Sequence, residues 1–170
     1  MSNPVLTALL ERRSIRQYTN RPITREEITT MLEAGRWAPS GKNNQPFRFL
    51  VVRSDDPRMD RLADCTIYSH VVKSAPLMIG VFLDKNSLYH ELKDHQSAGA
   101  CIQNIMLAAH SLGLGSVWLG QMMNNAEKVL DILSLDPATY EFITFITIGE
   151  PAKEGSSSRK PLEDIMLEQF

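Results

Sequence analysis

A cluster of cations near the N-terminus could bind an anion. Arg12, Arg13 and Arg16 lie close together, with Ser14 between them. Guanidinium groups bind phosphate through charge-assisted hydrogen bonds, and a neighbouring hydroxyl adds a further donor. Taken alone, such a cluster is more often a basic helix end exposed to solvent. The chemistry that it would support is binding of a phosphate group.

A second segment, Ala38–Phe47, is rich in small and amide side chains and leads into an apolar run. Asn43, Asn44 and Gln45 are adjacent, so three amides offer donors and acceptors within one loop. Alone, this loop could be an ordinary turn between a helix and a strand. Together with the arginine cluster, it predicts a site for a phosphorylated cofactor with a polar ring edge.

Two later segments give weaker indications of a ligand-binding site. The stretch Gly113–Gly120 follows a long helical pattern, and its simplest interpretation is a helix end and a tight turn. Its functional interpretation is that backbone N–H groups near Gly120 approach a ligand closely. Arg159 follows a run of serines and, taken alone, would be a loop charge.

Other catalytic patterns fail on spacing. Gly35, Gly41 and Lys42 imitate a phosphate-binding P-loop, but the glycines are one residue too far apart and the segment follows a helix. His90 and His95 are five residues apart, so they do not share a helix face and predict no metal site. No serine lies in a nucleophile elbow, and we expect no catalytic side chain.

Length and composition narrow the class of protein. The 170 residues predict one domain, 1–170, and 43% hydrophobic with 22% charged residues is typical of a soluble globular protein. A net charge of -2 argues against a general nucleic-acid binder. Cys65 and Cys101 have no zinc spacing. With no secretory signal or membrane-length apolar run, we expect a cytoplasmic protein and no membrane partner.

The elements that must position these residues can be read from the pattern. Asn3 and Pro4 open a first helix, whose apolar face is Val5, Leu6, Leu9 and Leu10, and the arginine cluster lies at its C-terminal end. Thr24 and Glu27 form a capping box for a second helix, which ends near Gly35–Trp37.

The remaining pattern interleaves strands with helices. Predicted strands are Phe47–Val52, Leu77–Leu83, Ser116–Leu119 and Phe142–Ile148. Predicted helices are Asp56–Leu62, Leu92–Leu112 and Ala126–Leu133, the last capped by Asn124 or Asn125, and a tail follows over Pro161–Phe170. The long helix is apolar nearly all round, which indicates a central helix or one buried in an oligomer. The fold class is α+β.

In their joint order, these motifs resemble the nitroreductase family of FMN enzymes. The matching segments are Arg12–Arg16, Ala38–Phe47, Gly113–Gly115, Ile148–Pro151 and Arg159–Leu162. The resemblance covers the chain from about Val5 to Ile165. It implies a mixed, mainly antiparallel sheet flanked by helices, in an intertwined homodimer with two FMN sites at the dimer interface.

The resemblance also implies roles for individual residues. Arg12, Arg13 and Ser14 would meet the phosphate or ribityl chain of FMN, and Arg159 would bind the phosphate. Arg16 would lie near the pyrimidine edge of the flavin. Backbone N–H groups of Leu119 and Gly120 would face the flavin N5. From the other subunit would come a set of ring contacts, namely Pro39, Ser40, Gly41, Asn43 and Gln45.

The function that this resemblance implies is an FMN-dependent oxidoreductase. It would use NADH or NADPH to reduce an electron-poor acceptor, of the nitroaromatic or quinone type, by ping-pong hydride transfer. The cofactor carries the redox chemistry, and the protein supplies position and electrostatics. Alternatives are dehalogenation, azoline dehydrogenation or flavin fragmentation on the same fold, a flavin-binding or storage protein with little turnover, and a non-flavin interaction domain.

Overall fold

The computed structural model describes residues 3–168. Within this range, the helices are α1 (Pro4–Glu11), α2 (Arg25–Arg36), α3 (Met59–Ala63), α4 (Ser69–Ser74), α5 (Glu91–Ser111) and α6 (Ala126–Leu133). The strands are β1 (Phe47–Arg53), β2 (Leu77–Asp84), β3 (Gly115–Trp118) and β4 (Tyr140–Gly149). Short 3₁₀ turns are η1 (Gly41–Asn43), η2 (Lys85–Ser87), η3 (Gly120–Asn125) and η4 (Leu162–Asp164).

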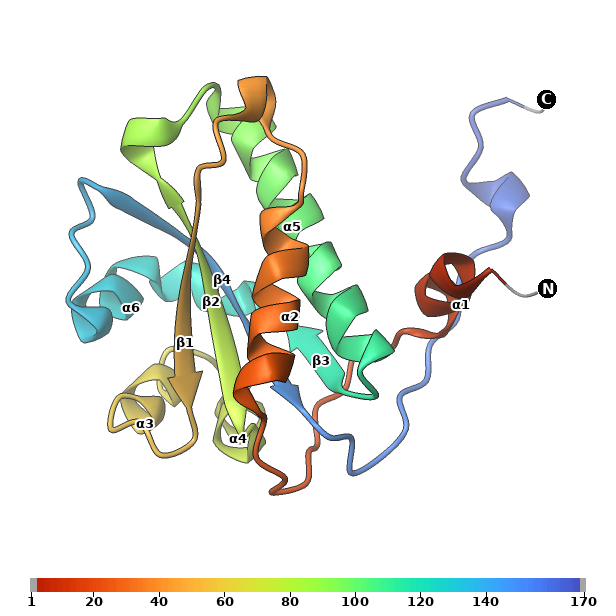
Figure 1. The fold of residues 1–170 in the computed structure, drawn as a ribbon, viewed down its shortest axis with the longest axis horizontal. Coiled ribbons are helices and arrows are strands. Elements are labelled where there is room, and N and C mark those ends of the chain that lie inside the picture. Colours follow the sequence, from red (N-terminus) through yellow and green to blue (C-terminus); the bar gives the residue numbers. More distant parts are fainter. Residues whose placement is uncertain (1–2, 169–170) are drawn as a thin grey trace.

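The strands form one sheet in the order β1-β2-β4-β3, and every strand pair is antiparallel. A single parallel bridge joins Ser14 to Ser116 on β3. The predicted α+β architecture, with a mixed and mainly antiparallel sheet flanked by helices, is confirmed. Figure 1 shows β2 in the middle of this sheet, as its continuous apolar run predicts.

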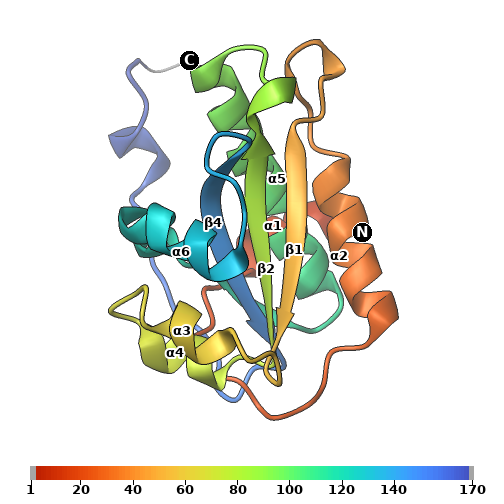
Figure 2. The same ribbon diagram turned by 90° about the vertical axis from the view of Figure 1, so that its left-hand side faces the viewer.

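Helices cover both faces of the sheet, as Figure 2 shows. Along β2, Leu77, Ile79 and Val81 face a core shared with α2 and α5. Met78 and Phe82 point the other way, into a core shared with α3, α4 and α6. Because side chains alternate along a strand, a strand buried on both faces must be apolar at every position.

Helix α5 provides many of the buried side chains in the core that it shares with α2. Ala98, Cys101, Ile102 and Ile105 are fully buried along it. Burial raises the pKa of the Cys101 thiol to about 12, so this cysteine is a packing residue, as the sequence predicts. The predicted capping box of α2 is present, because Thr24 accepts from the backbone of Glu27 and Glu27 accepts from that of Thr24.

Some predicted boundaries are wrong. The helix expected from Asp56 begins at Met59, because the Asp56 carboxylate binds the Arg58 backbone and guanidinium and closes a turn there. Helix α4 was not predicted. Asn125 precedes α6 as expected, but its side chain makes no capping bond and donates instead to the Cys65 carbonyl.

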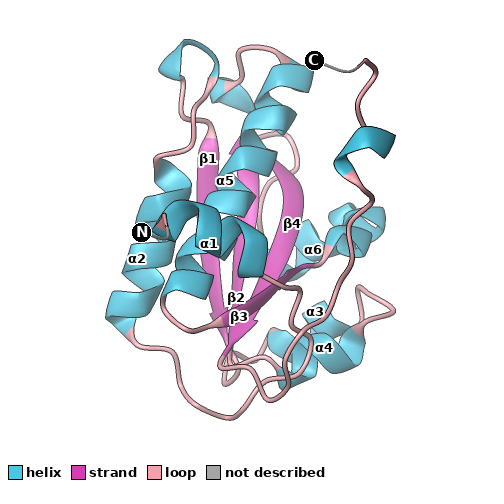
Figure 3. Cartoon of the chain, turned by 90° about the vertical axis from the view of Figure 1, so that its right-hand side faces the viewer, coloured by secondary structure: helices cyan, strands magenta, loops and turns pink. Residues whose placement is uncertain are grey.

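Helix α1 and the C-terminal tail stand away from the sheet. Figure 1 shows both on the same side of the sheet, and Figure 3, viewed from that side, shows them in front of the remaining fold and apart from each other. The predicted apolar face of α1 is exposed, with Leu10 74% accessible, and so are Leu162 and Ile165 of the tail. The last two residues of the predicted tail, 169–170, lie outside the described residues. Across residues 3–168, no helix has the length and apolarity needed to span a bilayer.

Candidate functional site

The arginine cluster is positioned by the edge of the sheet. After α1, the chain runs along β3, where the Ile15 N–H donates to the Ser116 carbonyl at 3.0 Å. Gly115 allows this approach, since a Cβ there would lie 2.7 Å from the Cβ of Ile15. The Arg13 guanidinium donates a hydrogen bond to the Leu10 carbonyl at 2.6 Å. This bond gives a partner to one of the carbonyl groups in the last turn of α1.

Arg12 lines a hollow of 520 Å³ between α1, the end of α5 and the start of β3, whose lining also includes Glu11 and Glu154. Its Nε and Nη1 atoms are buried and have no hydrogen-bond partner among residues 3–168. Burial, then the charge of Arg159, then that of Arg13 lower the pKa of Arg12. Three cations thus gather around buried N–H groups. Such groups are costly to leave unpaired, so the arrangement fits an anion.

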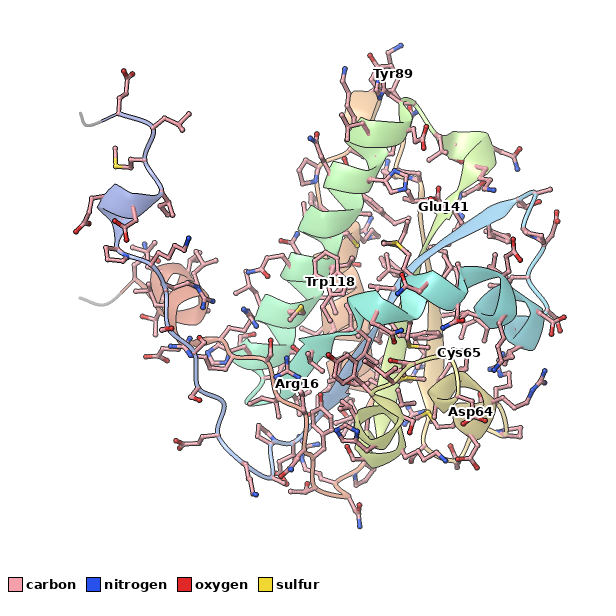
Figure 4. The ribbon with its side chains drawn as sticks, turned by 180° about the vertical axis from the view of Figure 1, so that it is seen from behind. Arg16, Asp64, Cys65, Tyr89, Trp118 and Glu141 are labelled. Carbon is pink, nitrogen blue, oxygen red and sulfur yellow. The ribbon has the colours of Figure 1, made fainter. Side chains whose placement is uncertain are left out.

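A second hollow, of 230 Å³, begins at Arg16, the residue after Ile15 of the first hollow. Its lining residues are Arg16, Tyr68, Val117, Trp118, Leu119, Gly120 and Gln121. Figure 4 shows Arg16 close below Trp118 in this part of the molecule. Ser14 and Arg16 are both exposed, on the stretch that joins the two hollows.

The two predicted backbone donors differ. The Leu119 N–H donates to the Phe145 carbonyl at 2.9 Å, and its side chain is buried. Leu119 therefore holds the sheet, and the expectation that its N–H faces a ligand is wrong in this structure. Gly120 is exposed at the first position of η3, where N–H groups have no partner within a helix. The predicted donor role falls to Gly120.

The amide loop has an unusual backbone. Lys42, Asn43 and Gln45 have φ values of 51°, 56° and 50°, in the left-handed region that most residues avoid. Ser40 holds this geometry, because its hydroxyl accepts from the Gln45 N–H at 2.9 Å. Backbone strain of this kind is often found at ligand-binding sites.

The loop residues differ in exposure. Pro39, Asn43 and Gln45 are exposed, while Ser40 and Gly41 are half-buried. The Asn44 side chain donates to the Ser87 carbonyl rather than pointing out.

The structure does not bring the predicted site together within one chain. Arg12 lies beside His110 and Gly113, at the end of α5. Gly41 packs against Tyr89, just before the start of α5. With 21 residues, α5 is about 30 Å long at 1.5 Å per residue. Figure 4 shows Tyr89 at one end of this helix and Arg16 near the other.

Sequence reasoning missed three residues at these sites. Tyr68 and Gln121 line the Arg16 hollow. Tyr89 packs on the amide loop, with the Lys42 ammonium 4.5 Å from its ring centre. Tyr89 is held by Asp94, whose buried carboxylate accepts the backbone N–H groups of Tyr89 and His90. The one usable signal was the position of Gln121 directly after Gly120, and such a pair is too common to identify a site.

Comparison with known proteins gives one consistent family. The Nitroreductase family model matches residues 9–67 and 58–150. A Methanothermobacter thermautotrophicus protein named as an NADH dehydrogenase/NAD(P)H nitroreductase is 34% identical over 151 residues, covering 88% of this chain and 78% of that protein.

Solved structures agree with this result. A Desulfovibrio desulfuricans structure described as a nitroreductase in complex with FMN has a TM-score of 0.98 and 54% identity, covering 100% of this chain and 99% of that one. The NADPH:FMN oxidoreductase of Vibrio harveyi, complexed with NAD+, has a TM-score of 0.88 and 27% identity, covering 99% and 78%. By its sequence and by its fold, the chain belongs to the nitroreductase family.

Proposed function

We propose that this chain, as one domain over residues 1–170, uses FMN and NADH or NADPH to reduce a nitroaromatic or quinone by ping-pong hydride transfer. As a nitroreductase family member, it is an NAD(P)H-dependent FMN oxidoreductase. The proposal concerns its acceptor, its mechanism, its site residues and its assembly. A cytoplasmic location is part of the proposal, and the two cysteines, both buried and unpaired, are compatible with a reducing compartment.

The observation that carries the proposal is the state of Arg12. Its buried Nε and Nη1 atoms lack partners among the described residues, and Arg13 and Arg159 add positive charge around them. A phosphate would neutralise this cluster and accept both N–H groups. The residues present therefore fit the phosphate end of FMN, and the exposed Ser14 would add a hydroxyl.

The ring of the flavin would extend from this phosphate site into the Arg16 hollow. Arg16 would lie at the pyrimidine edge, where its positive charge stabilises negative charge that develops during reduction. Gly120 would present its backbone N–H to the ring, and the exposed Trp118 side chain would flank it. When bound, FMN would accept a hydride from the nicotinamide and pass it to the acceptor. No side chain is required as an acid, because solvent can supply protons.

A homodimer would complete each site. The amide loop of one chain lies about a helix length from its own arginine cluster. A second copy, related by two-fold symmetry, would bring its Pro39–Gln45 loop to the first copy's Arg16 hollow. The exposed apolar side chains of α1 and of the tail would then be covered, as in an intertwined dimer.

The first experiment is an absorption titration of the purified protein. Added FMN should bind and, without oxygen, NADH or NADPH should bleach the bound flavin within seconds. Menadione or nitrofurazone should then restore the yellow colour. A flavin that stays oxidised with both nicotinamides would indicate a flavin carrier. Protein that binds no FMN would overturn the proposal.

A further inference from the structure

The loop between α3 and α4 is tied to the segment that carries Gly120. The Gln121 Oε1 atom accepts from the Thr66 hydroxyl at 2.6 Å and from the Ile67 N–H at 3.2 Å. Because a backbone N–H can only donate, the atom facing it must be the amide oxygen. The orientation of the Gln121 side chain is therefore fixed by the contact itself.

Thr66 links Gln121 to Tyr68 through hydrogen bonds. The Tyr68 N–H donates to the Thr66 hydroxyl at 3.1 Å, and the same hydroxyl donates to Gln121. Thr66 is 9% accessible, so its hydroxyl is the best shielded part of this relay, whereas the Ile67 N–H contact is exposed. A second tie from the same segment, Asn125 to the Cys65 carbonyl at 3.0 Å, holds the start of the loop. We call the Thr66–Gln121 contacts the clasp.

The clasp places an aromatic side chain at the ligand hollow. Tyr68 is 41% accessible and lines the hollow together with Arg16, Trp118 and Gly120. Its hydroxyl has no hydrogen-bond partner within residues 3–168, and nothing in the core requires its ring. The neighbouring Ile67 is 75% accessible, so packing alone would not fix this loop.

We propose that the clasp of Thr66 and Gln121 positions Tyr68 as a wall for a planar aromatic substrate at this hollow. Thr66 and Gln121 are positioning residues, and Tyr68 contacts the substrate ring. The inference rests on the proposed function, because a bound flavin ring is what the substrate would face. Gln121 directly follows Gly120, the predicted N5 donor. The clasp therefore joins the loop that carries Tyr68 to the segment of that donor, and it adds a specificity element.

The test compares Thr66→Val, which removes the hydroxyl at nearly constant shape, with Thr66→Ser, which keeps it. In the FMN-loaded protein, Thr66→Val should speed amide hydrogen exchange at Ile67 and Tyr68. It should also raise the KM for menadione about three- to tenfold, the range that one aromatic contact supports. The KM for ferricyanide, which has no ring to stack, should change less. Thr66→Ser should return both readouts toward wild type.

Tyr68→Leu should raise the menadione KM by a similar factor without faster exchange at Ile67, and it covers the case in which Thr66→Val does not fold. Faster exchange in Thr66→Val with an unchanged menadione KM would make the clasp purely structural and overturn the inference. An unchanged KM in Tyr68→Leu would do the same. If the wild type binds no FMN, the proposed function fails, whereas the exchange comparison still tests the clasp.

Discussion

The two ends of α5 carry two half-sites of opposite character. At the C-terminal end, Arg12 is half-buried beside a rigid sheet edge, and its N–H groups have no partner in the described structure. At the N-terminal end, Asn43 and Gln45 are exposed on a loop with a left-handed backbone, which is closed by short-range hydrogen bonds that include the one from the Gln45 N–H to the Ser40 hydroxyl. In one half-site the buried Nε and Nη1 atoms of Arg12 have no partner among residues 3–168, and the other half-site is a strained loop with exposed amide side chains.

This difference predicts how each half contributes to binding. The arginine half has already placed its cations, so a phosphate there gains charge-assisted hydrogen bonds with little reorganisation. The amide half contributes neutral hydrogen bonds, whose net strength is smaller. Affinity should therefore depend mostly on the arginine half, and the orientation of the ring on the amide half.

The largest expected effect is that of Arg12→Met. It should raise the FMN dissociation constant about 100-fold, because two hydrogen bonds to a charged phosphate are lost. Without FMN, the same variant should be at least as stable as wild type, since it removes a buried, unpaired charge. Fluorescence titration and thermal unfolding of both forms measure the two effects.

Arg61→Met is the control, because Arg61 is exposed on α3, lies near Asp131 and lines neither hollow. It should leave FMN affinity unchanged. If Arg12→Met lost stability without FMN and kept its affinity, Arg12 would be a structural residue and the assignment of the phosphate site would fail.

Much of the fold follows from the sequence, because its signals are local or periodic. The capping box of Thr24 and Glu27 and the apolar run of Leu77–Leu83 each predict their element directly. The failures have physical causes as well. Asp56 looks like the start of a helix but closes a turn with Arg58, and Ser69–Ser74 is too short to show a helical period.

The candidate site was only partly predictable. Spacing identified Arg12 and the amide loop, but it could not show that they lie at opposite ends of α5. Leu119 was expected to offer its N–H, yet strand pairing to Phe145 takes that group. Gln121 was missed because its partners Thr66 and Ile67 lie more than 50 residues away along the chain, and Tyr68 because the other residues of its hollow, such as Arg16 and Trp118, are also distant in sequence.

A smaller effect is expected in the amide half. Ser40→Ala removes the acceptor of the Gln45 N–H and should weaken FMN binding about fivefold, which corresponds to about 1 kcal/mol for one neutral hydrogen bond. Ser40→Thr, which keeps the hydroxyl, should bind FMN nearly as well as wild type. Equal losses of affinity in Ser40→Ala and Arg12→Met would contradict the difference between the two halves.

The smallest expected effect is a pH dependence near the amide end of α5. His95 binds the Glu91 carbonyl and the Glu141 carboxylate. Burial disfavours the charged ring, but these two partners outweigh it and raise the pKa of His95 above its usual 6.5. The stabilisation is full below the unfolded-state pKa and is lost as pH rises through the folded-state value.

The melting temperature should therefore fall slightly as buffers change from mildly acidic to mildly alkaline. His95→Gln should flatten that part of the profile. A steeper or reversed dependence in His95→Gln would show that another group controls it.

The central claim is that each site combines the arginine half of one chain with the amide half of another. Two variants impaired in different halves, Arg12→Met and the double variant Asn43→Ala/Gln45→Ala, can be co-expressed with different tags and the mixed dimer purified. Because two-fold symmetry would pair unlike halves, one site in the mixed dimer would be native, and we expect about one FMN per dimer, bound and reduced by NADH or NADPH as in the wild type. A mixed dimer whose FMN is bound and reduced only as weakly as in the Asn43→Ala/Gln45→Ala homodimer, or that binds no FMN, would contradict the account.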